Sequence, residues 1–360
     1  MEFSRQLPEY YLTASIEELS EKIKNAKQVL GDKLMILSHH YQRDEVVQFA
    51  DATGDSLQLA QIAAKNKKAE WIVFCGVHFM AETADMLTED YQKVILPDLD
   101  AGCTMADMVN DEDLEIAWSK LTEIYGDMLP ITYINSTASV KAFVGNHGGA
   151  TVTSSNARQI ITWALNQGKK VFFMPDQHLG RNVSFDLGIP LDEMALWDFI
   201  NQKLTSDGNI EDCKIILWDG FCSVHQQFNV EHIQEMRKSY PHINIIVHSE
   251  CCHEVVELSD AHGSTNKIIT EVEKSEPNSY FAIGTDINLV NRIAEKNIDK
   301  HIFSLNPDSC PCSTMNRISL QHLAWSIDNI LNEKIENQIT VDENTTKSAL
   351  KALDKMLELS

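Results

Sequence analysis

Short apolar runs alternate with longer amphipathic stretches along most of the chain. Helical periodicity is found between most of the runs, for example over 46–64, 157–166 and 230–238. Apolar runs without polar alternation, separated by helices, are typical of parallel strands covered on both faces. The pattern therefore predicts α/β architecture. The predicted strands are Leu34–Leu37, Trp71–Phe74, Val94–Leu96, Ile131–Ile134, Ala150–Val152, Val171–Met174, Ile215–Trp218, Ile243–Val247, Tyr280–Ile283 and His301–Leu305.

Each end of the chain adds a predicted helix. Ser15, with Glu18 three residues later, has the spacing of a capping box that opens a helix. Near the other end, an acidic polar stretch over 342–346 precedes a second helical pattern. One face of that pattern is apolar and consists of Ala349, Leu350, Leu353, Met356 and Leu357.

A weak internal repeat indicates three similar units. The segment Val94–Asp98 resembles Phe172–Asp176, since both run from apolar residues into Pro-Asp, and a glycine follows each. Polar clusters also end three strands, at 38–41, 133–136 and 219–222. We therefore predict three α/β domains with parallel sheets. They comprise residues 1–108 with the N-terminal helix, 109–196, and 197–360 with the C-terminal helical tail.

Composition narrows the possible partners. Hydrophobic residues make up 43% of the 360, and 53 acidic against 30 basic residues give a net charge of −23. Such a charge disfavours nucleic acid and anionic membranes as partners, although a local pocket can still bind small anions. No apolar stretch approaches the roughly 20 residues that span a bilayer. The first eight residues lack the apolar core of a signal peptide, so we expect a cytoplasmic protein.

Three of the eight cysteines follow apolar runs at predicted strand ends. They are Cys103, Cys222 and Cys310, and strand ends of a parallel sheet share the edge where ligands collect. Three thiols at such edges could hold one iron–sulfur cluster and leave one iron without a protein ligand. The segment Cys310-Pro-Cys312 offers two candidates for one ligand role. We expect Cys251 and Cys252 to be structural, and the sequence leaves open whether either close pair forms a disulfide.

Polar residues that suit acid–base and anion-binding work occupy the same strand ends. Imidazole, phenol and carboxylate groups move protons, and Ser or Thr at a helix start helps bind anions. The Gly-x-Gly-x-x-Gly, Walker and His-Glu-x-x-His motifs do not occur in the sequence. Their absence disfavours nicotinamide and nucleotide-triphosphate chemistry. The candidates are His39, Tyr41 and Ser56 in the first unit, Tyr133, Asn135 and Ser154 in the second, and His225, His248, Glu250, Ser264 and Thr265 in the third.

Taken together, these segments resemble the quinolinate synthase family, the A proteins of bacterial NAD biosynthesis. The resemblance runs from about Leu34 to Asn316, and its joint order is more specific than any single motif. Its segments are 38–42, 49–57, 75–84, 101–107, 133–138, 174–176 with 179–182, 248–251, 263–265, 284–285 and 310–311 with 315–316.

The resemblance implies a fold, a reaction and roles for particular residues. The family has three α/β/α domains around a pseudo-threefold axis, with a [4Fe–4S] cluster in the central cavity. It condenses iminoaspartate with dihydroxyacetone phosphate to quinolinate, phosphate and water, and the open iron serves as a Lewis acid. A functional partner is an L-aspartate oxidase or dehydrogenase that produces iminoaspartate. Matched motifs imply Cys103, Cys222 and Cys310 as ligands, with Cys310 preferred because it directly precedes the proline.

The matched motifs also divide the polar candidates by role. They imply Glu250 as the acid–base carboxylate, assisted by Tyr41 and His248. The remaining candidates are implied to line the substrate cavity, namely His39, Ser56, Tyr133, Asn135, Ser154, His225, Ser264 and Thr265.

Three departures and two alternatives accompany the resemblance. Asn266, Asp286 and Ser313 stand where the family usually has a small residue, Glu and Met. One alternative is another iron–sulfur dehydratase or lyase, which only a substrate assay separates. The other is a non-enzymatic iron–sulfur redox sensor, which the charge of −23 and the lack of a basic cluster disfavour.

Overall fold

The computed structural model describes residues 7–359 and divides into two compact units. The first unit comprises residues up to Cys103 together with Pro311–Asp342, and the second comprises Thr104–Cys310 with Glu343 onward. The signal-peptide prediction for the chain start falls largely on residues 1–6, outside the described part. Within residues 7–359, no helix has both the length and the apolar character needed to cross a membrane.

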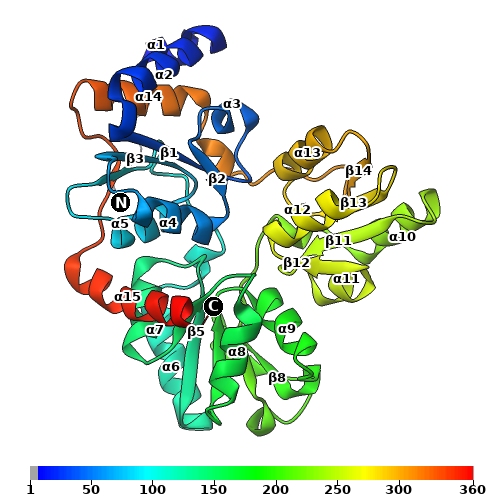
Figure 1. Ribbon diagram of the computed structural model, residues 1–360. Coiled ribbons are helices and arrows are strands. Elements are labelled where there is room, and N and C mark those ends of the chain that lie inside the picture. Colours follow the sequence, from blue (N-terminus) through cyan, green and yellow to red (C-terminus); the bar gives the residue numbers. More distant parts are fainter. Residues whose placement is uncertain (1–6, 360) are drawn as a thin grey trace. The chain divides into compact units, whose positions relative to one another are not determined.

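The first unit contains one five-stranded sheet in the order β15-β4-β3-β1-β2. All neighbours in it are parallel except β15 and β4. Figure 1 labels β1, β2 and β3 of this sheet. Its strands are β1 (Leu34–His39), β2 (Ala52–Gly54), β3 (Trp71–Cys75), β4 (Lys93–Ile95) and β15 (Gln338–Ile339). Its helices are α1 (Glu9–Thr13), α2 (Ile16–Leu30), α3 (Asp44–Val47), α4 (Ser56–Lys65), α5 (His78–Leu87) and α14 (Leu320–Leu331).

The second unit contains two sheets, in the orders β6-β5-β7-β10-β8-β9 and β12-β11-β13-β14. Only β8 and β9 pair antiparallel in them. The strands are β5 (Met128–Tyr133), β6 (Ala150–Val152), β7 (Lys170–Met174), β8 (Met194–Asp198), β9 (Lys203–Thr205), β10 (Ile215–Trp218), β11 (Asn244–His248), β12 (Ala261–Gly263), β13 (Tyr280–Gly284) and β14 (His301–Ser304). The helices are α6 (Asp111–Tyr125), α7 (Ala138–Asn146), α8 (Ala157–Leu165), α9 (Gln177–Asp186), α10 (Val230–Ser239), α11 (His253–Leu258), α12 (Thr265–Lys274), α13 (Ile287–Lys296) and α15 (Glu343–Glu358).

The α/β prediction is confirmed, with three sheets rich in parallel strands. All ten predicted strands occur, and α2 begins after Ser15, whose hydroxyl accepts a hydrogen bond from the Glu18 amide. The single helix predicted over 46–64 is wrong, because strand β2 interrupts it and pairs with β1. The predicted domain boundary at Leu196 falls inside β8, and the sheet that contains β8 continues to Trp218.

Two of the sheets begin with the same construction. In the first sheet, Asp51 lies just N-terminal to β2 and accepts the amide hydrogen of Ile36 in β1. In the third sheet, Asp260 lies just N-terminal to β12 and accepts the amide hydrogen of Ile245 in β11. In both pairs, the last residue of the first strand lies opposite the glycine that ends the second. Those two last residues are the candidate site residues His39 and His248, so the repeat places both imidazoles at a carboxyl edge.

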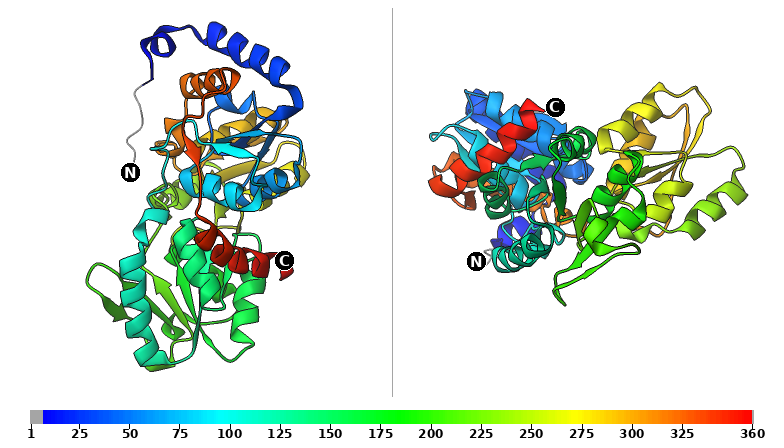
Figure 2. Two further views of the ribbon diagram at one scale, coloured as in Figure 1. Left: turned by 90° about the vertical axis from the view of Figure 1, so that its left-hand side faces the viewer. Right: turned by 90° about the horizontal axis from the view of Figure 1, so that it is seen from below.

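The C-terminal helix α15 packs along α7 of the second unit (Figure 2). Its predicted apolar face is buried at Ala349, Leu353 and Met356, whereas Leu357 is exposed. The approach is close at Gly145 of α7, where a Cβ atom would lie 2.1 Å from the carbonyl oxygen of Ser348.

We therefore expect Gly145→Ala to destabilise the protein by about 1–3 kcal/mol, because a backbone carbonyl cannot move aside without shifting α15. Urea unfolding followed by circular dichroism measures the change. Lys347→Ala, at an exposed position of the same helix, is the control and should stay within about 0.5 kcal/mol. Equal stability of the two variants would mean that α15 adjusts at no cost.

Candidate active site

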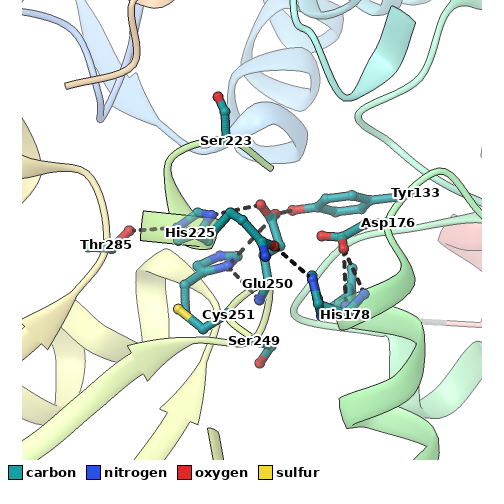
Figure 3. A network of polar contacts seen from close by, with 12 residues as sticks. Tyr133, Asp176, His178, Ser223, His225, Ser249, Glu250, Cys251 and Thr285 are labelled. Atoms are coloured by element: carbon teal, nitrogen blue, oxygen red, sulfur yellow. Dashed lines mark hydrogen bonds and ion pairs between the residues drawn. The ribbon is translucent and has the colours of Figure 1, made fainter. Parts of the chain in front are cut away.

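Glu250 lies two residues beyond β11 and is the centre of a buried polar group (Figure 3). Its Oε1 accepts a 2.7 Å hydrogen bond from the Tyr133 hydroxyl at the end of β5. Its Oε2 lies 2.9 Å from Nδ1 of His225, whose Nε2 lies 3.1 Å from the Thr285 hydroxyl. The carboxylate is thus joined to side chains from both sheets of the second unit.

Electrostatics keep the Glu250 carboxyl ionised. Burial by itself raises the pKa of this group, but neighbouring His248 and His225 and the hydrogen bonds from His225 and Tyr133 lower it below its ordinary value. An ionised carboxylate only accepts hydrogen bonds, so Nδ1 of His225 carries the shared proton. The chain of contacts is thus arranged to move a proton to or from Glu250.

His248 is held as a neutral imidazole with a defined tautomer. Its Nδ1 accepts the backbone amide hydrogen of Glu250 at 3.2 Å, which leaves Nε2 as the protonated nitrogen. Its ring stacks on that of His225, with centroids 4.5 Å apart and an interplanar angle of 19°. Burial lowers the pKa of His248 to about 3, so this side chain is a neutral hydrogen-bond donor near pH 7.

We expect His248 to remain neutral as pH falls from 8 to 5. A lowered pKa means that the unfolded chain takes up this proton near pH 6.5 while the folded one does not, so folding stability is lost as pH falls below that value. Histidine-selective NMR of the Cε1–H signal, assigned with His248→Gln, measures the titration. A midpoint for His248 above 6 would contradict the expectation.

Two residues outside the predicted set belong to the same group. Thr285 holds His225 from the end of β13, and Asp176 lies fully buried beside the group. Oδ1 of Asp176 accepts the amide hydrogens of His178 and Leu179 at the start of α9, while its buried Oδ2 has no hydrogen-bond partner among the residues that the structure describes. Burial and then the charge of Glu250 raise the pKa of Asp176, whereas the pKa of Glu250 is lowered, so the environments of these two carboxyls shift them in opposite directions.

In the first unit, His39 and Tyr41 repeat the backbone arrangement of His248 and Glu250. Nδ1 of His39 accepts the amide hydrogen of Tyr41 at 3.1 Å, and the two rings meet edge-to-face with centroids 4.7 Å apart. Ser56 is the first residue of α4, whose start is capped by Asp55. These three predicted residues therefore gather at the carboxyl edge of the first sheet.

The other predicted anion-binding residues lie in the second unit at loops or helix starts. Ser264 caps α12 by accepting the amide hydrogen of Lys267, and Thr265 is the first residue of that helix. Asn135 and Ser154 are half-buried just after β5 and β6, the neighbouring strands of one sheet. Backbone amides at helix starts bind carboxylates and phosphates, so these positions suit anionic substrates.

The Cys222 sulfur lies within 4.8 Å of ligating atoms of His225 and Glu250. That spacing alone would suit a mononuclear metal ion. Nδ1 of His225 and Oε2 of Glu250 are, however, hydrogen-bonded to each other, and both oxygens of Glu250 accept bonds. Of these three residues, Cys222 is therefore the one whose ligating atom can bind a metal group.

Three turns that contain a cysteine are built alike. A 3₁₀ helix begins three residues after Cys103, Cys222 and Cys312, and an N-cap residue follows seven residues after each. The N-caps are Asn110, Asn229 and Ser319, which open α6, α10 and α14. The carbonyls of Cys222 and Cys312 accept equivalent amide hydrogens, from Gln226 and Asn316 at 2.9 Å.

This repeat assigns Cys312, not Cys310, to the position of the other two thiols. All three cysteines of the repeat are half-buried and precede an exposed residue, whereas Cys310 is exposed. The Cys310 amide donates to Oε1 of Gln227 at 3.1 Å, so its backbone lies against the turn that follows Cys222. All eight cysteines are reduced thiols, and Cys75, Cys213 and Cys251 are buried in the core.

The three departures from the expected motifs cause no local conflict. Asn266 and Ser313 are exposed. Asp286 is fully buried and caps α13 by accepting the Asn288 amide hydrogen at 2.9 Å. A shorter acid at this position thus performs a capping role.

Comparisons with known proteins agree with this geometry. A family model described as quinolinate synthetase A protein matches residues 21–358. Quinolinate synthases of Listeria innocua and Listeria monocytogenes are both 59% identical to this chain over 355 residues, which cover 98% of it and 97% of each relative. The quinolinate synthase of Bacillus cereus is 57% identical over 353 residues, or 98% of this chain and 96% of the relative.

Proposed function

The chain belongs to the quinolinate synthase family, and we propose how its own residues perform that activity. Quinolinate synthases carry a [4Fe–4S] cluster. The substrates implied by the activity are iminoaspartate and dihydroxyacetone phosphate, both anionic. The observation that carries the residue roles is the buried, ionised Glu250 held between Tyr133 and His225.

Glu250 is the group that moves protons at the reacting carbons. Imine formation, isomerisation and dehydration each need a proton taken from one atom and given to another. Glu250 is ionised and can take one, and His225 can return one through its Nδ1–H. Tyr133 keeps the accepting carboxylate oriented, and Nε2–H of His248 is available to donate to a substrate oxygen.

The polar residues at strand and helix ends bind the charged parts of the substrates. Ser264 and Thr265 at the start of α12, and Ser56 at the start of α4, combine hydroxyls with the backbone amides of a helix start. We assign carboxylate and phosphate binding to them, with Asn135, Ser154 and His39 as further donors. Tyr41 is the proposed second proton donor.

We propose Cys103, Cys222 and Cys312 as the residues that hold the cluster. Thiolates are the ligands that iron–sulfur clusters prefer, and these three thiols occupy equivalent turns. When bound, the cluster supplies a Lewis-acidic iron without a cysteine ligand, which polarises a substrate oxygen. The choice of Cys312 rests on the repeat, whereas the motif alone favoured Cys310.

Anaerobic turnover tests the proposal directly. Protein purified without oxygen should contain about four iron and four sulfide per chain and convert the two substrates to quinolinate and phosphate. Liquid chromatography of quinolinate measures the product, and omission of dihydroxyacetone phosphate is the control. A fully loaded protein that forms no quinolinate would refute the proposed function.

We also propose that the iminoaspartate is supplied by an L-aspartate oxidase or dehydrogenase. Iminoaspartate is an imine and hydrolyses in water. An oxidase or dehydrogenase that releases it close to this protein would therefore reduce its loss. The ratio of quinolinate to oxaloacetate, measured while the amount of this protein is varied against a fixed oxidase, tests the coupling. A ratio that does not respond would contradict it.

A further inference from the structure

A cavity in the second unit is not lined by the acid–base group. Its volume is about 410 Å³, and Tyr133, His225, His248 and Glu250 are not among its lining residues. A cavity of a few hundred Å³ matches a small organic ligand. The cavity extends along α9 and reaches β8, β9 and the start of α11.

One end of this cavity contains Arg181, whose guanidinium donates hydrogen bonds to two neutral groups. The Arg181 guanidinium donates from NH2 to Oε1 of Gln177 at 3.0 Å and from NH1 to Nδ1 of His178 at 3.3 Å. Both acceptors are neutral, and within residues 7–359 the guanidinium forms no ion pair with a carboxylate. Burial lowers the pKa of Arg181, whereas the nearby carboxylates of Glu254, Asp176 and Asp219 raise it without forming hydrogen bonds to the guanidinium.

The two neutral acceptors fix the direction of the guanidinium. Burial lowers the pKa of His178 to about 4, and its Nε2 lies 2.9 Å from Oε1 of Gln226, so Nε2 carries the proton and Nδ1 accepts from Arg181. Arginine has five N–H donors, of which these contacts use one on each terminal nitrogen. The remaining donors form a fork of the kind that binds a carboxylate with two parallel hydrogen bonds.

The other residues that line the cavity indicate what the ligand is like outside the group that binds Arg181. Leu191, Met194 and Leu217 give it an apolar side that a flat hydrocarbon or ring can cover. Asp207 and Glu254 lie at the exposed rim, and their negative charges disfavour a ligand with several charges. A ligand with one carboxylate and an apolar body fits both the apolar side of the cavity and its acidic rim.

We propose that this cavity is a binding site for a small monocarboxylate with an apolar body, anchored by Arg181. The site is separate from the catalytic group but shares α9 with it. Asn182 of α9 donates to the carbonyls of Ser249 and Cys251, which flank Glu250, and His178 contacts the turn that contains His225 through Gln226. A ligand at Arg181 therefore contacts the helix that supports the catalytic carboxylate.

Benzoate is the probe, with benzamide as its neutral analogue. Saturation of the holoprotein should protect amides of α9 and of residues 194–207 from hydrogen exchange, read by mass spectrometry. Benzamide should protect neither segment. Arg181→Gln should weaken the benzoate effect more than tenfold, because it removes a charge-assisted bidentate contact. Arg158→Gln, which removes an exposed arginine of α8 in the same unit, should bind benzoate like the native protein.

The outcomes separate cleanly. Equal protection by benzamide, unchanged affinity in Arg181→Gln, or no protection of these segments in the native protein would each overturn the proposal. If Arg181→Gln does not fold, Arg181→Lys keeps the charge but not the fork and should still weaken benzoate binding more than Arg158→Gln. The readout does not depend on turnover, so it is independent of the proposed catalytic roles.

Discussion

Cys312→Ser is expected to abolish the brown colour of the anaerobically purified protein, whereas Cys310→Ser should keep it. A serine hydroxyl is a poor substitute for a thiolate, so loss of one of three ligands should leave less than about a tenth of the iron bound. Cys310 is exposed and outside the repeated turn, and its amide rather than its sulfur makes the recorded contact. Iron and sulfide analysis, together with the visible absorbance of the protein, measures the difference.

Cys310 and Cys312 are separated only by Pro311, and both are replaced by serine. A difference between the two variants therefore reports which sulfur binds the cluster. Cys103→Ser and Cys222→Ser serve as positive controls and should match Cys312→Ser. Bleaching of Cys310→Ser with full colour in Cys312→Ser would restore the choice that the Cys-Pro motif favoured. Thermal unfolding of each variant checks that the fold survives.

Glu250→Gln should lower kcat by about 10²–10⁴ with little change in bound iron. The amide keeps the size of the side chain and can still accept from Tyr133, but it cannot take a proton. Its NH₂ group would also face the Nδ1–H of His225, which forces the imidazole into the other tautomer. Anaerobic steady-state kinetics and iron analysis of the same preparation separate a catalytic loss from a loss of the cluster.

Glu257→Gln is the matched control, because Glu257 is an exposed carboxylate on α11, a few residues beyond Glu250. It should retain native kcat and iron content. A Glu250→Gln variant with more than about a tenth of native kcat would show that another group moves the proton. An equal loss in both variants would point to a general effect of charge.

The fold could largely be predicted because the longer strands are continuous apolar runs. Most of the missed strands are short, such as β2 and β12, whose three residues include polar and glycine positions and whose formation depends on pairing with β1 and β11. A periodicity over 46–64 therefore predicted one helix where β2 separates two. The five-residue β8 was missed as well, although three of its residues are buried. The boundary at Leu196 failed to coincide with a sheet end because nothing local to that residue records which strands pair.

The site could be predicted as far as residues are adjacent to strand ends. Glu250, His248 and Tyr133 were found in this way, and the structure brings them into one group. Thr285 was not predicted, because its role depends on the distance between β13 and the turn after β10. Asp176 stood in the matched Pro-Asp segment, but its burial beside Glu250 is a property of packing. The Cys312 assignment, in contrast, could have been drawn from the seven-residue spacing alone.

The repeated cysteine turn bears on how such a site could arise. The same short segment, with a cysteine seven residues before the N-cap of a helix, occurs three times. Its cysteines are Cys103, Cys222 and Cys312. Gene duplication followed by fusion produces such copies, and each copy brings one thiol before any side chain has diverged. Asymmetry of the catalytic side chains would have been the later acquisition, made possible once each copy could mutate alone.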